Sequence, residues 1–85
     1  MKEFTYTITD ELGIHARPAG LLVKETGKFK SNIALECNGK TADAKKIFSI
    51  MSLAAKHGDK ISVKIEGDDE IEACEKLEVF FKSNF

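Results

Sequence analysis

KISVKIE, residues 60–66, alternates polar and apolar side chains at every position. This alternation is typical of a β-strand that has one face against a core and the other in water. Gly67 ends the strand, and the acidic residues 68–70 that follow suit the positive end of a helix dipole. The stretch therefore predicts a strand that leads directly into a C-terminal helix.

Three segments have the apolar spacing of amphipathic helices. The C-terminal one would bury an apolar stripe formed by Ile71, Cys74, Leu77 and Phe81, flanked by Ala73 and Phe80, and it has Lys82 near its end. The first would end at Gly27 and face the core with Ala19, Leu22, Val23 and Thr26. The second would be capped by Asp43 and would bury Ile47, Ile50, Met51 and Ala54. Each helix thus has one face for a core.

Two further strands and a hairpin complete the pattern. Residues 4–8 and 33–37 alternate in the same way as residues 60–66, and Asn38-Gly39 is a strong signal for a tight hairpin turn. Residues 40–42 would return as a short edge strand. The order β-α-β-β-α-β-α predicts an α+β fold, a two-layer sandwich of an antiparallel sheet with helices on one side. A ferredoxin-like arrangement shares most of this order, and periodicity does not choose between the strand orders.

Size and composition favour one domain over residues 1–85 and exclude several classes of protein. The chain is 32% charged with a net charge of −1, so no overall basic field indicates nucleic acid as a partner. No apolar run reaches the ~18 residues of a membrane span, and residues 1–4 lead straight into a strand rather than a signal peptide, so we expect a cytoplasmic protein. Cys37 and Cys74 lack metal-ligand spacing and are predicted to be buried thiols. The acidic run 66–72 lacks the pattern of a calcium loop, which favours helix capping and no metal.

GIHARPAG, residues 13–20, joins a predicted strand to a predicted helix. The first backbone N–H groups of a helix lack partners and attract anions, which makes this a place for a phosphate. Neutral imidazole is a nucleophile at cytosolic pH, so His15 could attack phosphorus. The guanidinium of Arg17 is a permanently charged fork that could hold the phosphoryl oxygens. Pro18 suits a first helical turn but biases Arg17 away from helical dihedral angles.

The same residues also have structural interpretations. His15 could be a solvated loop residue, Arg17 a surface charge and Pro18 only a helix start. Phe48 lies about 100° from Ile47 on a helical wheel, so it is either at the rim of the core or in contact with a partner. His57 is most simply a residue at a helix end rather than a catalytic one.

Four segments together resemble the histidine-containing phosphocarrier (HPr) family of the bacterial phosphoenolpyruvate-dependent sugar phosphotransferase system. They are residues 13–19, the hairpin Asn38-Gly39-Lys40-Thr41, the run Met51-Ser52-Leu53, and Glu66-Gly67 before the acidic helix start. The resemblance covers the chain end to end. It implies an open-faced four-stranded antiparallel sheet with three helices on one face.

The resemblance also implies a relay. Enzyme I, charged by phosphoenolpyruvate, would place a phosphoryl group on Nδ1 of His15, and an enzyme IIA domain of a sugar permease would remove it. Arg17 and the backbone N–H groups of Ala16 and Arg17 would steady the phosphoryl charge. The protein would be a monomeric carrier with a phosphohistidine intermediate rather than an independent enzyme, and would need no cofactor. Its modest partner surface would comprise Leu21, Lys24, Lys45, Ile47, Phe48 and Met51.

One position departs from the family pattern. Many members carry a regulatory serine directly before the Ile of the second helix, and a dedicated kinase phosphorylates it. Here that position is Lys46, which has no hydroxyl, and Ser49 and Ser52 are out of register.

The alternative to a phosphoryl carrier is a non-transferring regulator of the same fold that binds transcription factors or metabolic enzymes. The pair His15 and Arg17 counts against that alternative, because a pure binding module does not need it.

Overall fold

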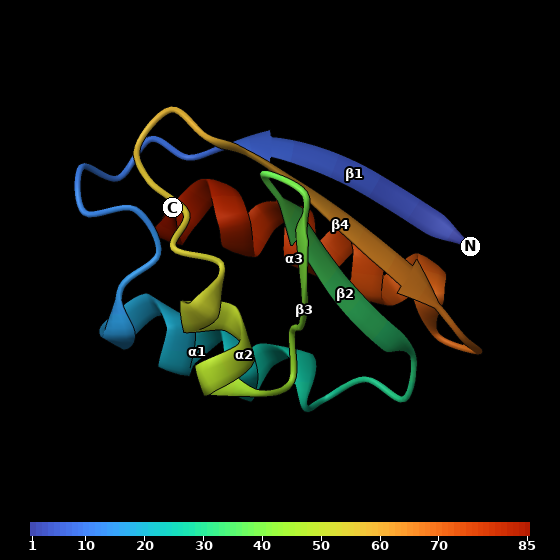
Figure 1. The fold of residues 1–85 in the computed structure, drawn as a ribbon. Helices are drawn as coiled ribbons and strands as arrows, with labels where there is room; N and C mark the ends of the chain where they lie inside the picture. Colours follow the sequence, from blue (N-terminus) through green and yellow to red (C-terminus); the bar gives the residue numbers. More distant parts are fainter.

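The sheet and the three helices form two layers, with all helices on one face of the sheet (Figure 1). The structure, a computed structural model, describes residues 1–85. In chain order the elements are β1 (Lys2–Thr7), α1 (Ala16–Thr26), β2 (Asn32–Cys37), β3 (Lys40–Asp43), α2 (Ile47–Ser52), β4 (Lys60–Glu66) and α3 (Glu70–Asn84). The predicted fold class and element order are confirmed.

The four strands pair antiparallel in the order β1-β4-β2-β3. The clearest strand of the sequence, β4, is therefore central, with Val63 opposite Phe4 of β1 on one side and Leu35 of β2 on the other. The predicted hairpin forms: Asn38 and Gly39 both have positive φ angles, 52° and 80°, as a two-residue turn between twisted strands requires. β3 is an edge strand, as its short length suggested.

The core lies between the sheet and the helices. Leu22 of α1, Leu35 of β2, Ile50 of α2 and Ile65 of β4 are all completely buried. Phe81 of α3 is also fully buried and packs edge-on against Phe4 and Tyr6 of β1, with ring centroids 5.8 Å apart in both pairs. The apolar faces of all three helices thus meet one face of the sheet, as the alternation and spacing predicted. Burying a large side chain of this kind stabilises the fold by roughly 1.5–3 kcal/mol.

The predicted core face of the second helix is wrong in part. α2 has only six residues and begins at Ile47, so Asp43 is not its cap; the Asp43 carboxylate instead accepts a hydrogen bond from the Lys45 N–H at 2.9 Å. Ala54 lies beyond the helix, is exposed, and has a φ angle of 52°. Met51 is 38% exposed. The apolar spacing continued past the point where the chain leaves the helical conformation.

One prediction about a helix face is wrong, and one about a helix end is confirmed with a different geometry. Ile71, in the first turn of α3, is 62% exposed, and the buried stripe of that helix begins at Ala73. α1 ends at Gly27 as predicted, but the glycine has a right-handed φ of −64° rather than a left-handed one.

The acidic residues at the start of α3 bind both the helix entry and a neighbouring loop. The Glu70 carboxylate accepts a hydrogen bond from Gly67 N–H at 3.1 Å. Asp69 makes no side-chain capping hydrogen bond. Its carboxylate accepts hydrogen bonds from the Ser31 hydroxyl and from the N–H groups of Lys30 and Ser31, and these hold its pKa below the ordinary value. The capping interpretation therefore holds for Glu70, while Asp69 links α3 to the loop before β2.

Both cysteines are buried, as predicted. Burial, helped by the nearby charge of Asp59, raises the pKa of the Cys37 thiol. Burial and the charge of Glu78 raise the pKa of the Cys74 thiol. Neither cysteine is therefore activated as a nucleophile.

Candidate functional site

His15 occupies the N-cap position of α1, where the backbone is still extended (φ −113°, ψ 176°). Its carbonyl accepts the first hydrogen bond of the helix, from Ala19 N–H at 3.0 Å. Its side chain makes no capping hydrogen bond and is 35% exposed. The imidazole is therefore positioned by the helix entry yet free to react with a group that approaches from solvent.

The start of α1 provides backbone donors beside this ring. N–H groups of a first helical turn have no partner within the helix. Pro18, the third helical residue, has no N–H, which leaves those of Ala16 and Arg17. The first turn has no acidic residue, so nothing on it opposes an anion. The predicted phosphate-binding groups thus lie at one helix terminus.

Arg17 is exposed and forms no salt bridge, so its guanidinium is available to an incoming anion. It is the second residue of α1 and has helical conformation. The expected bias of Arg17 away from helical dihedral angles is therefore not observed.

Asp10 is a site residue that the sequence did not indicate. The Asp10 Oδ2 atom lies 3.5 Å from Nε2 of His15. The other oxygen, Oδ1, accepts a hydrogen bond from Leu12 N–H at 2.8 Å, and the Asp10 carbonyl accepts one from Gly13 N–H at 2.9 Å. An Asp followed three residues later by a Gly is a turn signal, but it does not reveal which side chain the turn will meet.

Two neighbouring segments fix this loop. Gly13 has a φ of 67°, and a Cβ atom there would overlap the carbonyl oxygen of Ala55, which also accepts a hydrogen bond from Ile14 N–H at 3.1 Å. Only glycine fits such a close approach with a left-handed backbone. On the other side, the N–H groups of Thr9 and Asp10 both donate to the main-chain oxygen of Phe85, at 2.6 and 2.7 Å. The site loop is thus held from both sides.

The predicted partner residues lie on α1 and α2, which run side by side below the sheet (Figure 1). Phe48 is 86% exposed and Leu21 is 44% exposed. Ile47 is half-buried against Gly20 of α1, where α1 and α2 pack together. Exposure on this scale excludes the interpretation of Phe48 as a residue at the rim of the core and leaves partner contact as the remaining one.

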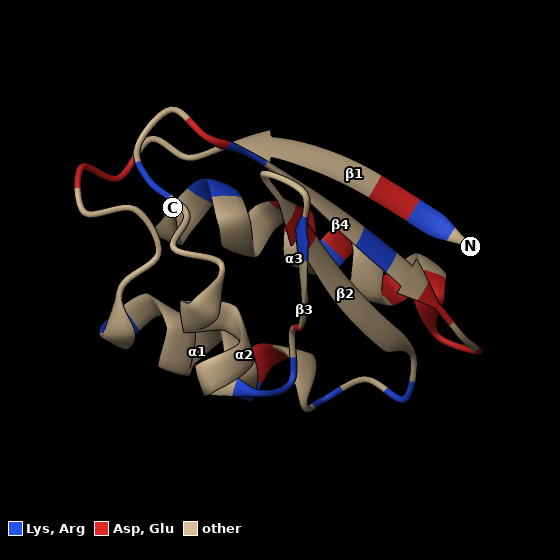
Figure 2. Ribbon diagram, in the orientation of Figure 1, with Lys and Arg blue, Asp and Glu red and all other residues tan.

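The charges around these helices are not uniform. Figure 2 shows basic residues on the chain before α2 and between α1 and β2, and acidic residues in the loop before α1 and at the start of α3. Lys24 and Lys46 are exposed. Lys45 is half-buried, and its ammonium donates to the Phe29 carbonyl at 2.8 Å, so it is less free than Lys24.

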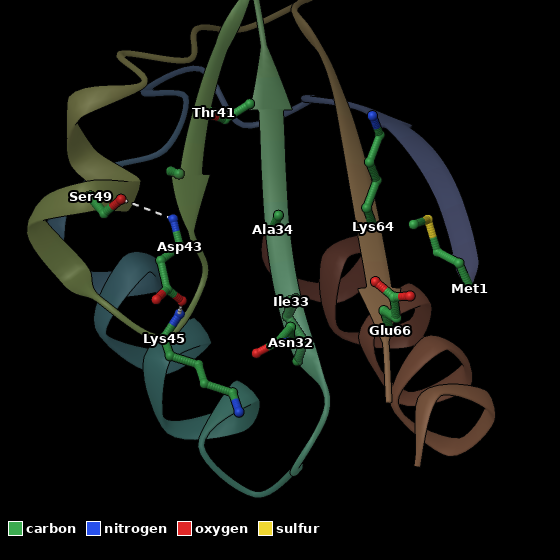
Figure 3. A pocket seen from close by; sticks show the side chains of 11 residues that line it. Met1, Asn32, Ile33, Ala34, Thr41, Asp43, Lys45, Ser49, Lys64 and Glu66 are labelled. Carbon is green, nitrogen blue, oxygen red and sulfur yellow. Dashed lines mark hydrogen bonds between the residues drawn. The ribbon is translucent and has the colours of Figure 1, made fainter. Parts of the chain in front are cut away.

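One hollow of the molecule lies away from this site. It is open, has a volume of about 500 Å³, and lies where β2, β3 and β4 meet the start of α2 (Figure 3). Lys45, Asp43 and Ser49 line it together with β-strand residues, and the Ser49 hydroxyl accepts a hydrogen bond from Asp43 N–H at 2.9 Å. Neither His15 nor Arg17 lines this hollow. The hollow and the candidate site are therefore distinct.

No group of three or more His, Cys, Asp or Glu side chains is placed to hold a metal ion. His57 is exposed in the turn before β4 and forms no ion pair. No helix has the length and apolar character needed to cross a membrane.

The structure is an open-faced α+β domain that presents a histidine and an arginine at a helix entry. The family model for the PTS HPr component phosphorylation site matches residues 2–83. A phosphocarrier protein HPr of Xylella fastidiosa is 41% identical over 85 residues, covering 100% of this chain and 96% of that one. The chain therefore belongs to the HPr family of phosphotransferase-system phosphocarriers.

Solved structures agree with this assignment. An HPr structure from Thermoanaerobacter tengcongensis superposes with a TM-score of 0.93 at 44% identity, over 100% of this chain and 96% of that one. A structure of an HPr dimer from the same organism gives a TM-score of 0.77 at 43% identity, over 98% and 95% of the two chains. The fold is thus shared with proteins solved both as an HPr chain and as a dimer.

Proposed function

We propose that the chain accepts a phosphoryl group from enzyme I on Nδ1 of His15 and passes it to enzyme IIA domains of sugar permeases, as a cytoplasmic monomer. The observation that carries this proposal is the half-exposed imidazole of His15 at the entry of α1, beside the free N–H groups of Ala16 and Arg17. The imidazole neither caps the helix nor fills the core, and it lies beside backbone donors that a merely solvated histidine would not need.

The chemistry needs alignment and charge stabilisation more than covalent machinery. His15 is the nucleophile when the phosphoryl group arrives and the leaving group when it departs. The unpaired guanidinium of Arg17 contacts the phosphoryl oxygens, and the α1 terminus adds the positive end of its dipole. Because the same groups face solvent, both donor and acceptor histidines can approach in line.

The exposed side chains of Phe48, Leu21 and Met51 form the apolar part of the partner surface, and Lys24 contributes charge at its rim. Lys45 and Ile47 belong to this surface at its margin, since one binds the Phe29 carbonyl and the other packs on Gly20. A small patch of this kind suits a carrier that must leave each partner quickly.

Lys46 prevents regulation by a serine kinase at its position, because it has no hydroxyl to phosphorylate. A phosphoserine would add roughly −1.5 to −2 of charge beside Phe48, whereas Lys46 adds a positive charge. The protein is therefore a carrier that such a kinase cannot turn down, and its surface suits an acidic partner. Stoichiometric phosphoserine formed by purified kinase and ATP would contradict this.

Incubation with phosphoenolpyruvate and enzyme I tests the carrier role. The expected product is an acid-labile, alkali-stable adduct that forms on the wild type and on His57→Ala but not on His15→Ala. Addition of an enzyme IIA domain should then discharge it. An adduct that survives in His15→Ala, or one that no enzyme IIA domain from a panel removes, would overturn the assignment in favour of the non-transferring regulator.

A further inference from the structure

The Asp10 carboxylate is in ion-pair range of the His15 ring. We propose that Asp10 is a positioning residue for phosphoryl transfer: its carboxylate holds the proton on Nε2 of His15, which leaves the lone pair of Nδ1 free for phosphorus. This inference rests on the proposed function, and it adds a residue and a role to it.

The position of the carboxylate follows from its surroundings. Oδ1 is engaged by Leu12 N–H, so Oδ2 is the oxygen left to face the imidazole. The backbone of Asp10 is tied at both ends, its N–H to Phe85 and its carbonyl to Gly13 N–H. The carboxylate therefore reaches His15 from a loop whose shape is already determined, with little side-chain entropy left to lose.

The tautomer of a neutral histidine is set by the hydrogen bond that its other nitrogen makes. A carboxylate can only accept, so its presence beside Nε2 favours the form with hydrogen on Nε2. The other ring nitrogen is not occupied by the helix, because the His15 side chain accepts no capping hydrogen bond from the first turn. The geometry thus selects the tautomer that can react at Nδ1.

The charge that develops on the His15 ring during transfer also supports this role of Asp10. The Nδ1 lone pair forms the new N–P bond while the N–P bond of the donor phosphohistidine breaks, and the donor nitrogen keeps that electron pair. Nε2 keeps its proton, so the His15 ring becomes cationic as the bond forms. The Asp10 carboxylate, 3.5 Å away, offsets this charge, in the manner of the aspartate of a catalytic triad. A contact of this length shortens once the ring carries charge, because charge-assisted hydrogen bonds are shorter than neutral ones.

Two variants and one matched control test the role. Asp10→Asn and Asp10→Ser remove the charge but keep a side-chain oxygen for Leu12 N–H, while Glu11→Gln removes the neighbouring charge, which belongs to an exposed side chain with no ion pair. We expect both Asp10 variants to accept phosphoryl from phosphorylated enzyme I about fivefold more slowly than the wild type, and Glu11→Gln to stay within about twofold. Nitrogen-15 NMR of the free proteins at alkaline pH should show less of the Nε2–H tautomer in the Asp10 variants only.

An unchanged tautomer ratio in both Asp10 variants would overturn the inference, even if the transfer rate fell. Unchanged transfer rates in both variants would overturn it as well. The NMR spectra also report whether each variant is folded, and two different replacements guard against a local defect in either one. If the wild type itself accepted no phosphoryl group, the proposed function would fail, while the tautomer measurement on the free protein would still decide the contact between Asp10 and His15.

Discussion

Gly13 and Ala54 each have a left-handed backbone within the segments that surround His15, with φ angles of 67° and 52°. They differ in what their environment allows. Gly13 lies against the carbonyl of Ala55 and has no room for a Cβ atom. Ala54 has the left-handed conformation although its Cβ atom disfavours it. Single substitutions at these residues should therefore have opposite effects.

Gly13→Ala should destabilise the protein by about 2–4 kcal/mol and slow phosphoryl acceptance, because the new methyl group both strains the backbone and displaces the Ala55 carbonyl. Urea unfolding measures the first effect. Gly39→Ala is the matched control: its φ is 80°, but nothing lies within 4 Å of the added atom, so only the conformational cost of about 1 kcal/mol should appear. Equal losses in the two variants would show that the close approach at Gly13 is unimportant.

Ala54→Gly should stabilise the protein by up to about 1 kcal/mol, since glycine adopts the left-handed conformation without the steric penalty. Thermal unfolding reports the change. Ala34→Gly, at an exposed position of β2 with an ordinary backbone, should instead destabilise by roughly 0.5–1 kcal/mol. Destabilisation by Ala54→Gly would mean that the strain is not present in solution.

At this scale the sequence indicated His15 and Arg17 but not Asp10. A histidine and an arginine before a helix suggest their chemistry from local spacing alone, since both act at the same helix terminus. Asp10 acts through a turn whose path depends on Ala55 and Phe85, and both of these are distant in sequence. Sequence spacing contains no information on contacts of that kind.

At the scale of elements, α1 and α2 carry the proposed partner surface, and α3 contributes Phe81 to the core. Phe48→Ala should change stability by less than about 0.5 kcal/mol, because the side chain is 86% exposed, but should weaken transfer to or from partners. Phe81→Ala, at a fully buried position of α3, should cost about 3–5 kcal/mol. Transfer kinetics that are unchanged in Phe48→Ala would remove this residue from the partner surface.

The link between α3 and the loop before β2 should make stability depend on pH. The Ser31 hydroxyl and the N–H groups of Lys30 and Ser31 lower the pKa of Asp69 in the folded protein, so its contribution is fully present above the pKa of the unfolded chain, about 4. This contribution is lost as the pH falls from about 4 through the pKa of Asp69 in the folded protein. Asp69→Asn should reduce stability at neutral pH and flatten this acid limb in urea titrations. The Asp68 carboxylate makes no hydrogen bond, so Asp68→Asn should leave both the stability and its acid limb unchanged. A similar effect of the two variants would contradict the link.

The helices and strands were predictable where the sequence pattern agrees with the surroundings of the element in the fold. β4, the hairpin at Asn38-Gly39 and the buried stripe of α3 from Cys74 onward follow from alternation, turn chemistry and helical spacing. The length of α2 does not, because its apolar spacing continues through Ala54 while the backbone there turns left-handed. The strand order also does not, because alternation shows only that a strand has one buried face and not which strand lies beside it.

At the scale of the whole molecule, the domain has two exposed sheet edges, the outer sides of β1 and β3. β3 is short, and both edge strands carry charged side chains, Lys2 and Glu3 on one and Lys40 and Asp43 on the other, which discourages pairing between copies. Sedimentation equilibrium should therefore give the mass of one chain, 9.4 kDa. Twice that mass would place the protein with the dimeric HPr of Thermoanaerobacter tengcongensis.

The central claim concerns one nitrogen atom in this molecule, and mapping the phosphoryl group tests it most directly. After reaction with phosphoenolpyruvate and enzyme I, nitrogen-15 and phosphorus-31 NMR at neutral to alkaline pH should show a single phosphoryl group on Nδ1 of His15 and no product from His15→Ala. A phosphoryl group on Nε2, on His57 or on a serine, or none at all, would contradict the account.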